Sequence, residues 1–379
     1  MSITPERGFL PPQDPLSRLP RAFDPWEQVA AELPKLLGAG RARDVIGRMA
    51  PLDARKLRGE RQLRRAMLLL SYFGHAYIWQ DATLVRCLPA NLAVPWHAVA
   101  EKLGRPPVLS YASYALDNWR RIDLDGPIEL GNIALLQNFL AGVDEEWFIL
   151  VHVAIEAQAG PAMQAIGLAQ RAVKTKDPHL LAQQLHIIAT TTEQMLMTLE
   201  RMPEKCDPYI YYRRVRPYIH GWKNHPLLPE GLIYDGVEAY GGKPQRFRGE
   251  TGAQSGIVPA LDAALGITHA DDPLRPYLLE MRQYMPPGHR RFIEAIERGP
   301  KVRPFVLEHR DSHRELRDRY NSAVHWLAAF RAKHFEYANT YIFRQAQREP
   351  ANPTTVGTGG TPFMPYLQKH RDETLAHRI

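Results

Sequence analysis

The chain has 379 residues, of which 45% are hydrophobic and 23% charged, and its formal net charge is +7. This composition predicts a globular protein with a sizeable core, long enough for two domains of about 100–200 residues. The basic residues form only short runs, so nucleic-acid binding is not expected. The only cysteines, Cys87 and Cys206, provide neither a disulfide framework nor a cysteine metal site.

The N-terminal twenty residues are rich in proline and charge, whereas a secretory signal requires an apolar stretch. No uninterrupted apolar run approaches the ~18 residues that indicate a membrane span. We therefore expect a cytoplasmic protein that does not bind membranes.

Helical patterns dominate the first third of the chain. Apolar residues recur at helical spacing over residues 26–37, with Asp24 as the expected cap. Residues 63–79 are apolar enough for a long buried helix. Residues 88–119 predict a loop, a helix, a proline break and a second helix. Because no segment shows the sustained two-residue alternation of a sheet protein, the predicted fold class is all-α.

Two interruptions divide the chain. The first is the turn-rich segment 122–127, and the second is the long Pro- and Gly-rich stretch 224–256. Irregular stretches of that length inside compact proteins are usually functional or disordered. Helical patterns resume at residue 257 and continue towards the glycine-threonine segment 357–361.

His334 is the first candidate for chemistry. It shares a helix face with an apolar stripe that includes Leu327, seven residues before it, and Tyr341, seven residues after it. One interpretation is a core histidine bonded to a carbonyl group. The other is an axial ligand of haem, because neutral imidazole commonly binds haem iron. Periodicity alone does not decide between them.

His152 lies on another apolar helix, with Phe148 one turn before it and Glu156 one turn after it. Taken alone it is also interpreted as structural. Together, however, His152 and His334 suit the two sides of a haem plane, where a polar distal group acts on bound O₂. The chain has no CxxCH motif, so any haem would be non-covalent.

Arg216 lies where arginines and aromatic residues interleave, in residues 209–222. This mixture suits a solvated helix face, a nucleic-acid surface, or a pocket in which arginine pairs with the carboxylate of an aromatic amino acid. The segment 357–361, GTGGT, lacks the preceding strand, the lysine and the spacing of phosphate-binding motifs. We interpret it as a hinge or lid.

Eight segments in the same order make almost the whole chain resemble the indoleamine 2,3-dioxygenase family. They are PLSRLPRAFDPWEQVAAELP, LPANLAVP, GRPPVLSYASYALDNW, GWKNHPLLPEGLIYDGV, AQSGIVPALDAALGI, MRQYMPPGHRRFI, FRAKHFEYANTYI and GTGGTPFMPYLQKHRDET.

The resemblance implies a small N-terminal α domain with an extended arm, residues 1–125, and a large α domain, residues 126–379, that contains a lid loop at 349–361. The large domain would hold haem b. By its place in the R-x-x-H motif, His334 matches the proximal iron ligand. The other implied cofactor-binding residues are Arg331 and Asp262, a charged pair beside that ligand, and Gly252, in a loop near the haem edge.

The resemblance also implies a substrate pocket. Phe148 would stack on the indole ring, Arg216 would bind the substrate carboxylate, and Thr358 would contact the amino-acid backbone from the lid. The segment that carries Tyr111, Tyr114 and Ala115 would line the distal side.

The implied reaction inserts O₂, as co-substrate, across the indole C2–C3 bond of L-tryptophan or another indoleamine to give N-formylkynurenine. Two alternatives remain open: a tryptophan-rearranging haem enzyme of the pyrrolnitrin-pathway type, and a haem protein that only binds O₂. The protein would be a monomer or a dimer.

The sequence departs from the family pattern at two places. His152 replaces the distal serine of the animal enzymes, as in the related tryptophan 2,3-dioxygenases, and we expect it to act in catalysis by accepting a hydrogen bond from the indole N–H. Glu250 and Thr251 replace smaller groups in a run that is commonly GGSA-like. Both departures concern substrate preference.

Overall fold

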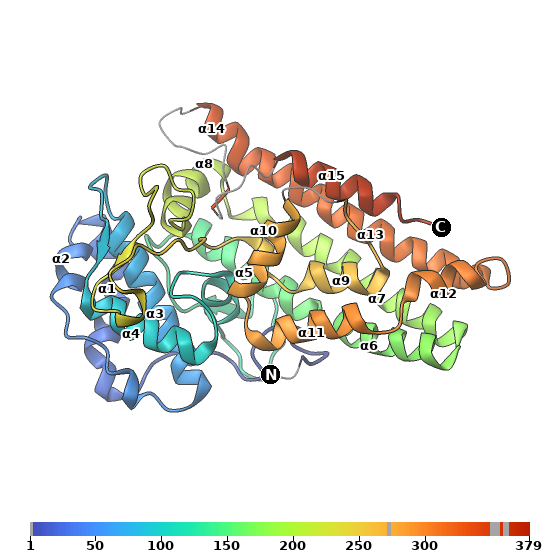
Figure 1. The fold of residues 1–379 in the computed structure, drawn as a ribbon, viewed down its shortest axis with the longest axis horizontal. Coiled ribbons are helices and arrows are strands. Elements are labelled where there is room, and N and C mark those ends of the chain that lie inside the picture. The colour runs from blue at the N-terminus through green and yellow to red at the C-terminus, as the bar shows by residue number, and fades with distance from the viewer. Residues whose placement is uncertain (1–2, 271–273, 349–356, 359–363) are drawn as a thin grey trace.

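The computed structural model describes residues 3–270, 274–348, 357–358 and 364–379. Most of these residues are helical and very few form strands, which confirms the all-α prediction (Figure 1). The strands of the described residues are only two or three residues long. They are β1 (Cys87–Leu88), parallel to β4 (Ile233–Tyr234), and β2 (Trp119–Arg121), antiparallel to β3 (Ile133–Leu135).

The N-terminal part forms one group of helices, coloured blue to cyan in Figure 1. It contains α1 (Asp24–Gly38), α2 (Ala42–Gly47), α3 (Gly59–Trp79) and α4 (Ala90–Leu103). Helix α3 is buried along most of its length, as its apolar sequence predicts. The expected cap at Asp24 is wrong. This residue already has helical backbone angles, Phe23 precedes the helix, and the Asp24 carboxylate accepts a hydrogen bond from Arg18 instead.

The helix expected after the proline break is also wrong. The chain forms only a five-residue π-helical turn, Ala112–Leu116, and then enters β2. The side-chain amide of Asn118 donates to the Tyr72 hydroxyl and to the carbonyl of Gln137, which holds this segment beside α3 and the end of the β2–β3 hairpin. The domain boundary at 125/126, which lies in the hairpin connection, stays a prediction.

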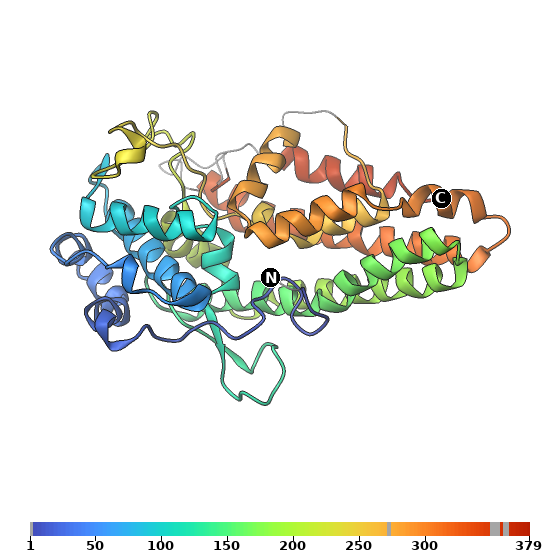
Figure 2. The same ribbon diagram turned by 60° about the horizontal axis from the view of Figure 1, so that its bottom comes forward.

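The C-terminal part is a second group of helices (Figure 2). Its longer helices are α5 (Val143–Gln158), α6 (Gly160–Thr175), α7 (Pro178–Glu200), α9 (Ile257–Leu265), α10 (Leu274–Met281), α11 (Pro287–Arg298), α12 (Val302–His309), α13 (Arg314–Ala338) and α15 (Met364–Leu375). Two short helices, α8 (Pro208–Ile210) and α14 (Arg344–Arg348), complete it. Helix α13 packs against both α7 and α15, and α7 packs against α6.

Helix α5 joins two buried hydrophobic clusters. Its residues Leu150 and Val153 belong to the cluster of the N-terminal helices, whereas Val151 and Ile155 belong to the cluster around α6, α7 and α13. Phe148 packs against both clusters. A side chain on this part of α5 therefore lies at the junction of the two halves of the molecule.

The segment 224–256 is mostly irregular, as its composition predicts, and contains only β4 and short 3₁₀ turns. Besides Ala112–Leu116, π-helical turns occur at Tyr211–Val215 and Asn339–Phe343. Such turns are rare and are frequently found at functional sites.

Candidate active site

His334 lies near the end of α13 and faces a cavity of about 900 Å³. The His334 side chain lies deep in the protein but is exposed to solvent, because it forms part of the cavity surface. Burial, together with the smaller effects of the nearby His152 and Arg331, lowers the pKa of His334 to about 4. The imidazole is therefore neutral at physiological pH and offers a nitrogen lone pair. The interpretation of His334 as a packed core histidine is wrong.

The cavity is lined by apolar, polar and charged side chains. The apolar lining includes Val258, Pro259, Ala263, Phe330, Ala338 and Ile342. The polar lining includes Thr251 and Ser255. The structure brings the cofactor-binding residues predicted from the sequence together here, since Gly252, Asp262, Arg331 and His334 all line this one cavity, as does Thr358.

Arg331, three residues before His334, ties α13 to its neighbours. Its Nη1 and Nη2 donate to the two carboxylate oxygens of Asp262 on α9, at 2.9 and 2.6 Å, and Nη1 also donates to Thr374 Oγ1 on α15 at 2.6 Å. Burial is the largest influence on Asp262 and opposes its ionisation, but the charge of Arg331 and the hydrogen bonds from Arg331 and His269 together outweigh it and lower the pKa to about 2. The ion pair fixes the helix turn that carries His334.

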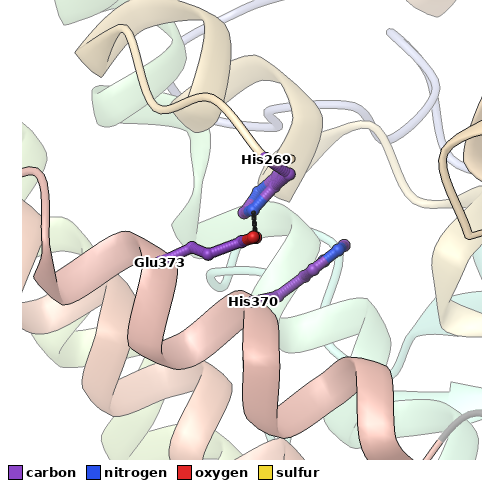
Figure 3. A group of neighbouring side chains, drawn as sticks. All are labelled: His269, His370 and Glu373. Carbon is purple, nitrogen blue, oxygen red and sulfur yellow. Dashed lines mark hydrogen bonds and ion pairs between the residues drawn. The ribbon is translucent and has the colours of Figure 1, made fainter. Parts of the chain in front are cut away.

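Three further side chains meet beside this ion pair (Figure 3). His269 Nδ1 lies 2.7 Å from Glu373 Oε2, and the His269 ring stacks on His370 with centroids 3.9 Å apart and planes at 14°. Possible ligand atoms of the three residues lie within 4.8 Å of one another, as in a metal site. A histidine binds a metal in the plane of its ring, however, so two parallel stacked rings do not point at one ion. We interpret the group as a contact that holds α15 against the chain after α9.

A second group of predicted residues surrounds α5. The ring centroids of Phe148 and His152 are 4.7 Å apart, and Phe148 also contacts Tyr211 at 4.6 Å and Tyr114 at 6.3 Å. Tyr111 contacts His152 edge to face at 6.0 Å. Four of the predicted residues therefore form one aromatic cluster. Tyr211, from the π-helical turn Tyr211–Val215, belongs to it and was missed by the sequence analysis.

The hydrogen bond of His152 defines which of its nitrogens is free to accept. His152 Nδ1 lies 2.7 Å from the carbonyl oxygen of Phe148. A carbonyl oxygen only accepts, so Nδ1 carries the proton and Nε2 has the lone pair. Burial lowers the pKa of His152, which keeps the ring neutral.

A buried carboxyl group connects this aromatic cluster with the cavity. Glu156 Oε1 accepts from the Tyr111 hydroxyl at 2.9 Å and from Ser255 Oγ at 2.6 Å, and Ser255 lines the cavity. Burial raises the pKa of Glu156 to about 7. Neither Glu156 nor Ser255 was predicted from the sequence to have a role in the site. The available signal was the four-residue spacing from Phe148 through His152 to Glu156, which places all three on one stripe of α5.

Arg216 and Thr358 lie on adjoining segments. Arg216 is fully buried at the start of the 3₁₀ helix Arg216–Ile219, and its Nη1 lies 3.0 Å from His220 Nε2. Thr358 Oγ1 donates to the carbonyl oxygen of Glu250 at 2.5 Å, and its own carbonyl accepts from the amide of Gly221. Apart from residues 357 and 358, the predicted lid 349–361 lies outside the described residues.

The fold and the site define a helical protein with a neutral histidine facing a large cavity and an aromatic cluster beside it. The family model described as indoleamine 2,3-dioxygenase matches residues 1–377. The chain is 38% identical to indoleamine 2,3-dioxygenase 1 of Rattus norvegicus, covering 98% of this chain and 93% of the relative. It is 35% identical to indoleamine 2,3-dioxygenase 2 of Homo sapiens (98% and 93%) and 34% identical to the Saccharomyces cerevisiae indoleamine 2,3-dioxygenase (99% and 92%).

The chain therefore belongs to the indoleamine 2,3-dioxygenase family and is a dioxygenase. These matches do not favour the rearranging enzyme or the oxygen carrier considered above. In the described part of the chain, no helix combines the length and the apolar character that crossing a membrane requires.

Proposed function

We propose that this enzyme inserts both atoms of O₂ across the C2–C3 bond of L-tryptophan or a related indoleamine and forms N-formylkynurenine. The observation that carries the proposal is the arrangement of two neutral histidines. His334 faces the cavity from α13, and His152 on α5 lies close enough that protonation of one ring would oppose protonation of the other.

The cavity fits a non-covalent haem b. Its volume of about 900 Å³, its apolar lining and the neutral imidazole of His334 suit a large planar group with an axial nitrogen ligand. Neither Cys87 nor Cys206 lines the cavity. His334 would bind the iron, Arg331 and Asp262 would position the helix that carries it, and Gly252 would approach the haem edge. When bound, haem supplies the activation of O₂.

The remaining predicted residues would hold the substrate. The guanidinium group of Arg216 would pair with the carboxylate, and the rings of Phe148 and Tyr114 would pack on the indole. His152 Nε2 would accept a hydrogen bond from the indole N–H, because Nδ1 is already committed to the Phe148 carbonyl. Tyr111, held by Glu156, would complete the distal wall, and Thr358 would contact the amino-acid backbone. Positioning of this kind is the protein's main contribution to a reaction between two bound partners.

The proposal is tested with the reduced, haem-loaded enzyme, L-tryptophan and ¹⁸O₂. We expect a product that contains two ¹⁸O atoms, detected by mass spectrometry. A product with one labelled oxygen would contradict dioxygenation, and tryptophan that remains unconsumed would contradict the proposed substrate. Glu308→Gln, a change on the exposed side of α12, serves as the control and should leave the product unchanged.

A further inference from the structure

Glu250 is a buried carboxylic acid to which the proposed reaction assigns no role. It is only 4% exposed, and among the described residues no hydrogen bond or ion pair to its carboxylate is found. Burial alone raises its pKa to about 8. A buried carboxyl group without a partner stays protonated near neutral pH, and a cation brought beside it favours its ionised form. Glu250 is therefore available to pair with a positively charged ligand.

The backbone places Glu250 about one helical turn from Arg216. The amide of Glu250 donates to the carbonyl of Ile219 at 3.1 Å, and Ile219 ends the 3₁₀ helix that Arg216 begins. Because a 3₁₀ helix has three residues per turn, Arg216 and Ile219 lie one turn apart on the same edge.

The two segments are packed closely against each other. A Cβ atom at Gly249 would lie 2.2 Å from the amide nitrogen of Gly221, so the two backbones touch directly. Thr358 bonds to the same pair of segments through Glu250 and Gly221. The backbone of Glu250 is therefore bonded to Thr358 and lies one helical turn from Arg216, the two residues proposed to hold the polar end of the substrate.

The charges of Glu250 and Arg216 act on the same aromatic ring. Burial raises the pKa of Tyr211, the negative charge of Glu250 raises it further, and the positive charge of Arg216 lowers it. Tyr211 packs on Phe148 at 4.6 Å. The charge of Glu250 also contributes to the raised pKa values of Tyr111 and Tyr114. The carboxyl group is thus close enough to act electrostatically on three tyrosines of the aromatic cluster that would enclose the indole ring.

We propose that Glu250 binds the ammonium group of the amino-acid substrate while Arg216 binds its carboxylate. This inference rests on the proposed function and makes the pocket selective for a zwitterion. A charged hydrogen bond to a buried carboxylate is worth more than a neutral one, so the selectivity is measurable. The departure of Glu250 from the smaller residues of the family's GGSA-like run is then a specificity feature.

The test compares two ligands in the haem-loaded enzyme. L-Tryptophan has both charges, whereas indole-3-propionate has the carboxylate but lacks the ammonium group. We expect Glu250→Gln to raise the KM for tryptophan by about 10- to 100-fold, with a smaller change in kcat. The Kd of indole-3-propionate, measured by calorimetry, should change less than about twofold. This ligand has no ammonium group, so it would make no contact with Glu250 that the substitution could remove.

Different results would contradict the role of Glu250 and the proposed oxidation of tryptophan. Equal weakening of both ligands would overturn the role of Glu250, because the change would then act on pocket shape rather than on charge. An unchanged KM in Glu250→Gln would overturn it as well. Wild-type enzyme that does not oxidise tryptophan would instead contradict the proposed function. Binding of indole-3-propionate by the variant shows that its pocket is folded, and Glu308→Gln should match the wild type with both ligands.

Discussion

Arg331 holds Asp262 with two parallel hydrogen bonds of 2.9 and 2.6 Å, one helical turn before His334. The pair joins α13 to α9, and the bond from Arg331 to Thr374 adds α15 to the same junction. Three helices from distant parts of the chain thereby set the direction in which the histidine faces the cavity.

Breaking this ion pair should destabilise the protein. Asp262→Ala leaves Arg331, which is 9% exposed, without its carboxylate partner. We expect the free energy of unfolding to fall by about 3 kcal/mol, measured by urea denaturation without haem. Asp318→Ala removes the partner of an exposed pair with Arg317 on the same helix and should cost less than about 1 kcal/mol. An equal decrease in the free energy of unfolding in the two variants would show that the buried ion pair contributes no more to stability than the exposed one.

Replacing His334 should weaken haem binding. His334→Gln removes the imidazole that faces the cavity but keeps a polar side chain of similar length. We expect the haem affinity to fall about 100-fold, or roughly 3 kcal/mol, in a titration followed by haem absorbance. His325→Gln changes an exposed histidine on the same helix and should bind haem normally. Normal haem affinity in His334→Gln would assign the iron to another ligand.

The tautomer of His152 predicts discrimination against an N-methylated indole. Since Nε2 would accept from the indole N–H, wild-type enzyme should use tryptophan better than 1-methyltryptophan. His152→Ala should lower kcat/KM for tryptophan about tenfold and should remove most of this preference. Steady-state kinetics with both substrates check the prediction. Equal use of both substrates by the wild type, together with unchanged kinetics in the variant, would exclude this role of His152.

The buried carboxyl groups should make stability fall as the pH rises. Burial raises the pKa of Glu145 and of Glu156 to about 7, from about 4.5 in the unfolded chain. Between these values the folded state binds more protons, so the stabilisation is complete below pH 4.5 and is lost as the pH rises through 7. The glutamine in Glu156→Gln is neutral at both pH 5 and pH 8. The free energy of unfolding should therefore change less between these pH values in the variant than in the wild type, with a difference of up to about 3 kcal/mol.

The comparison between variant and wild type isolates this effect from the buried histidines. Burial lowers the pKa of His75 to about 4 and that of His289 to about 3, which makes stability rise with pH in the acidic range. These groups are the same in wild type and variant, so they cancel in the difference. We would measure the free energy of unfolding at both pH values by denaturation. The proteins compared are the wild type, Glu156→Gln and the exposed control Glu308→Gln. The expectation fails when all three proteins show the same change.

Local sequence patterns predicted the parts of the fold that depend on one segment. The helix over 63–79 and the apolar stripe around His334 follow from the spacing of apolar residues. The π-helical turn Ala112–Leu116 and the β2–β3 hairpin do not, because their geometry depends on bonds such as those from Asn118 to Tyr72 and Gln137. Tertiary contacts of this kind override local preference.

The site shows the same division. The spacing of Arg331 and His334 is visible within one helix, and the family resemblance supplied Asp262. The contacts of Glu156 with Ser255 and of His269 with Glu373 join residues 99 and 104 positions apart. No periodic pattern reports such pairs. The unpartnered carboxylate of Glu250 became evident only when its burial and surroundings were known.

Helix α5 carries Phe148, His152 and Glu156 on a single stripe, whereas Tyr211, Arg216 and Glu250 lie on short turns and a loop. A shift of α5 would displace its three side chains together and would disturb both hydrophobic clusters. In the turns and the loop, one residue can be substituted without displacing the other side chains of the site. New substrate preferences should therefore arise in evolution or in the laboratory through the irregular segments, with α5 kept as the constant frame of the reaction.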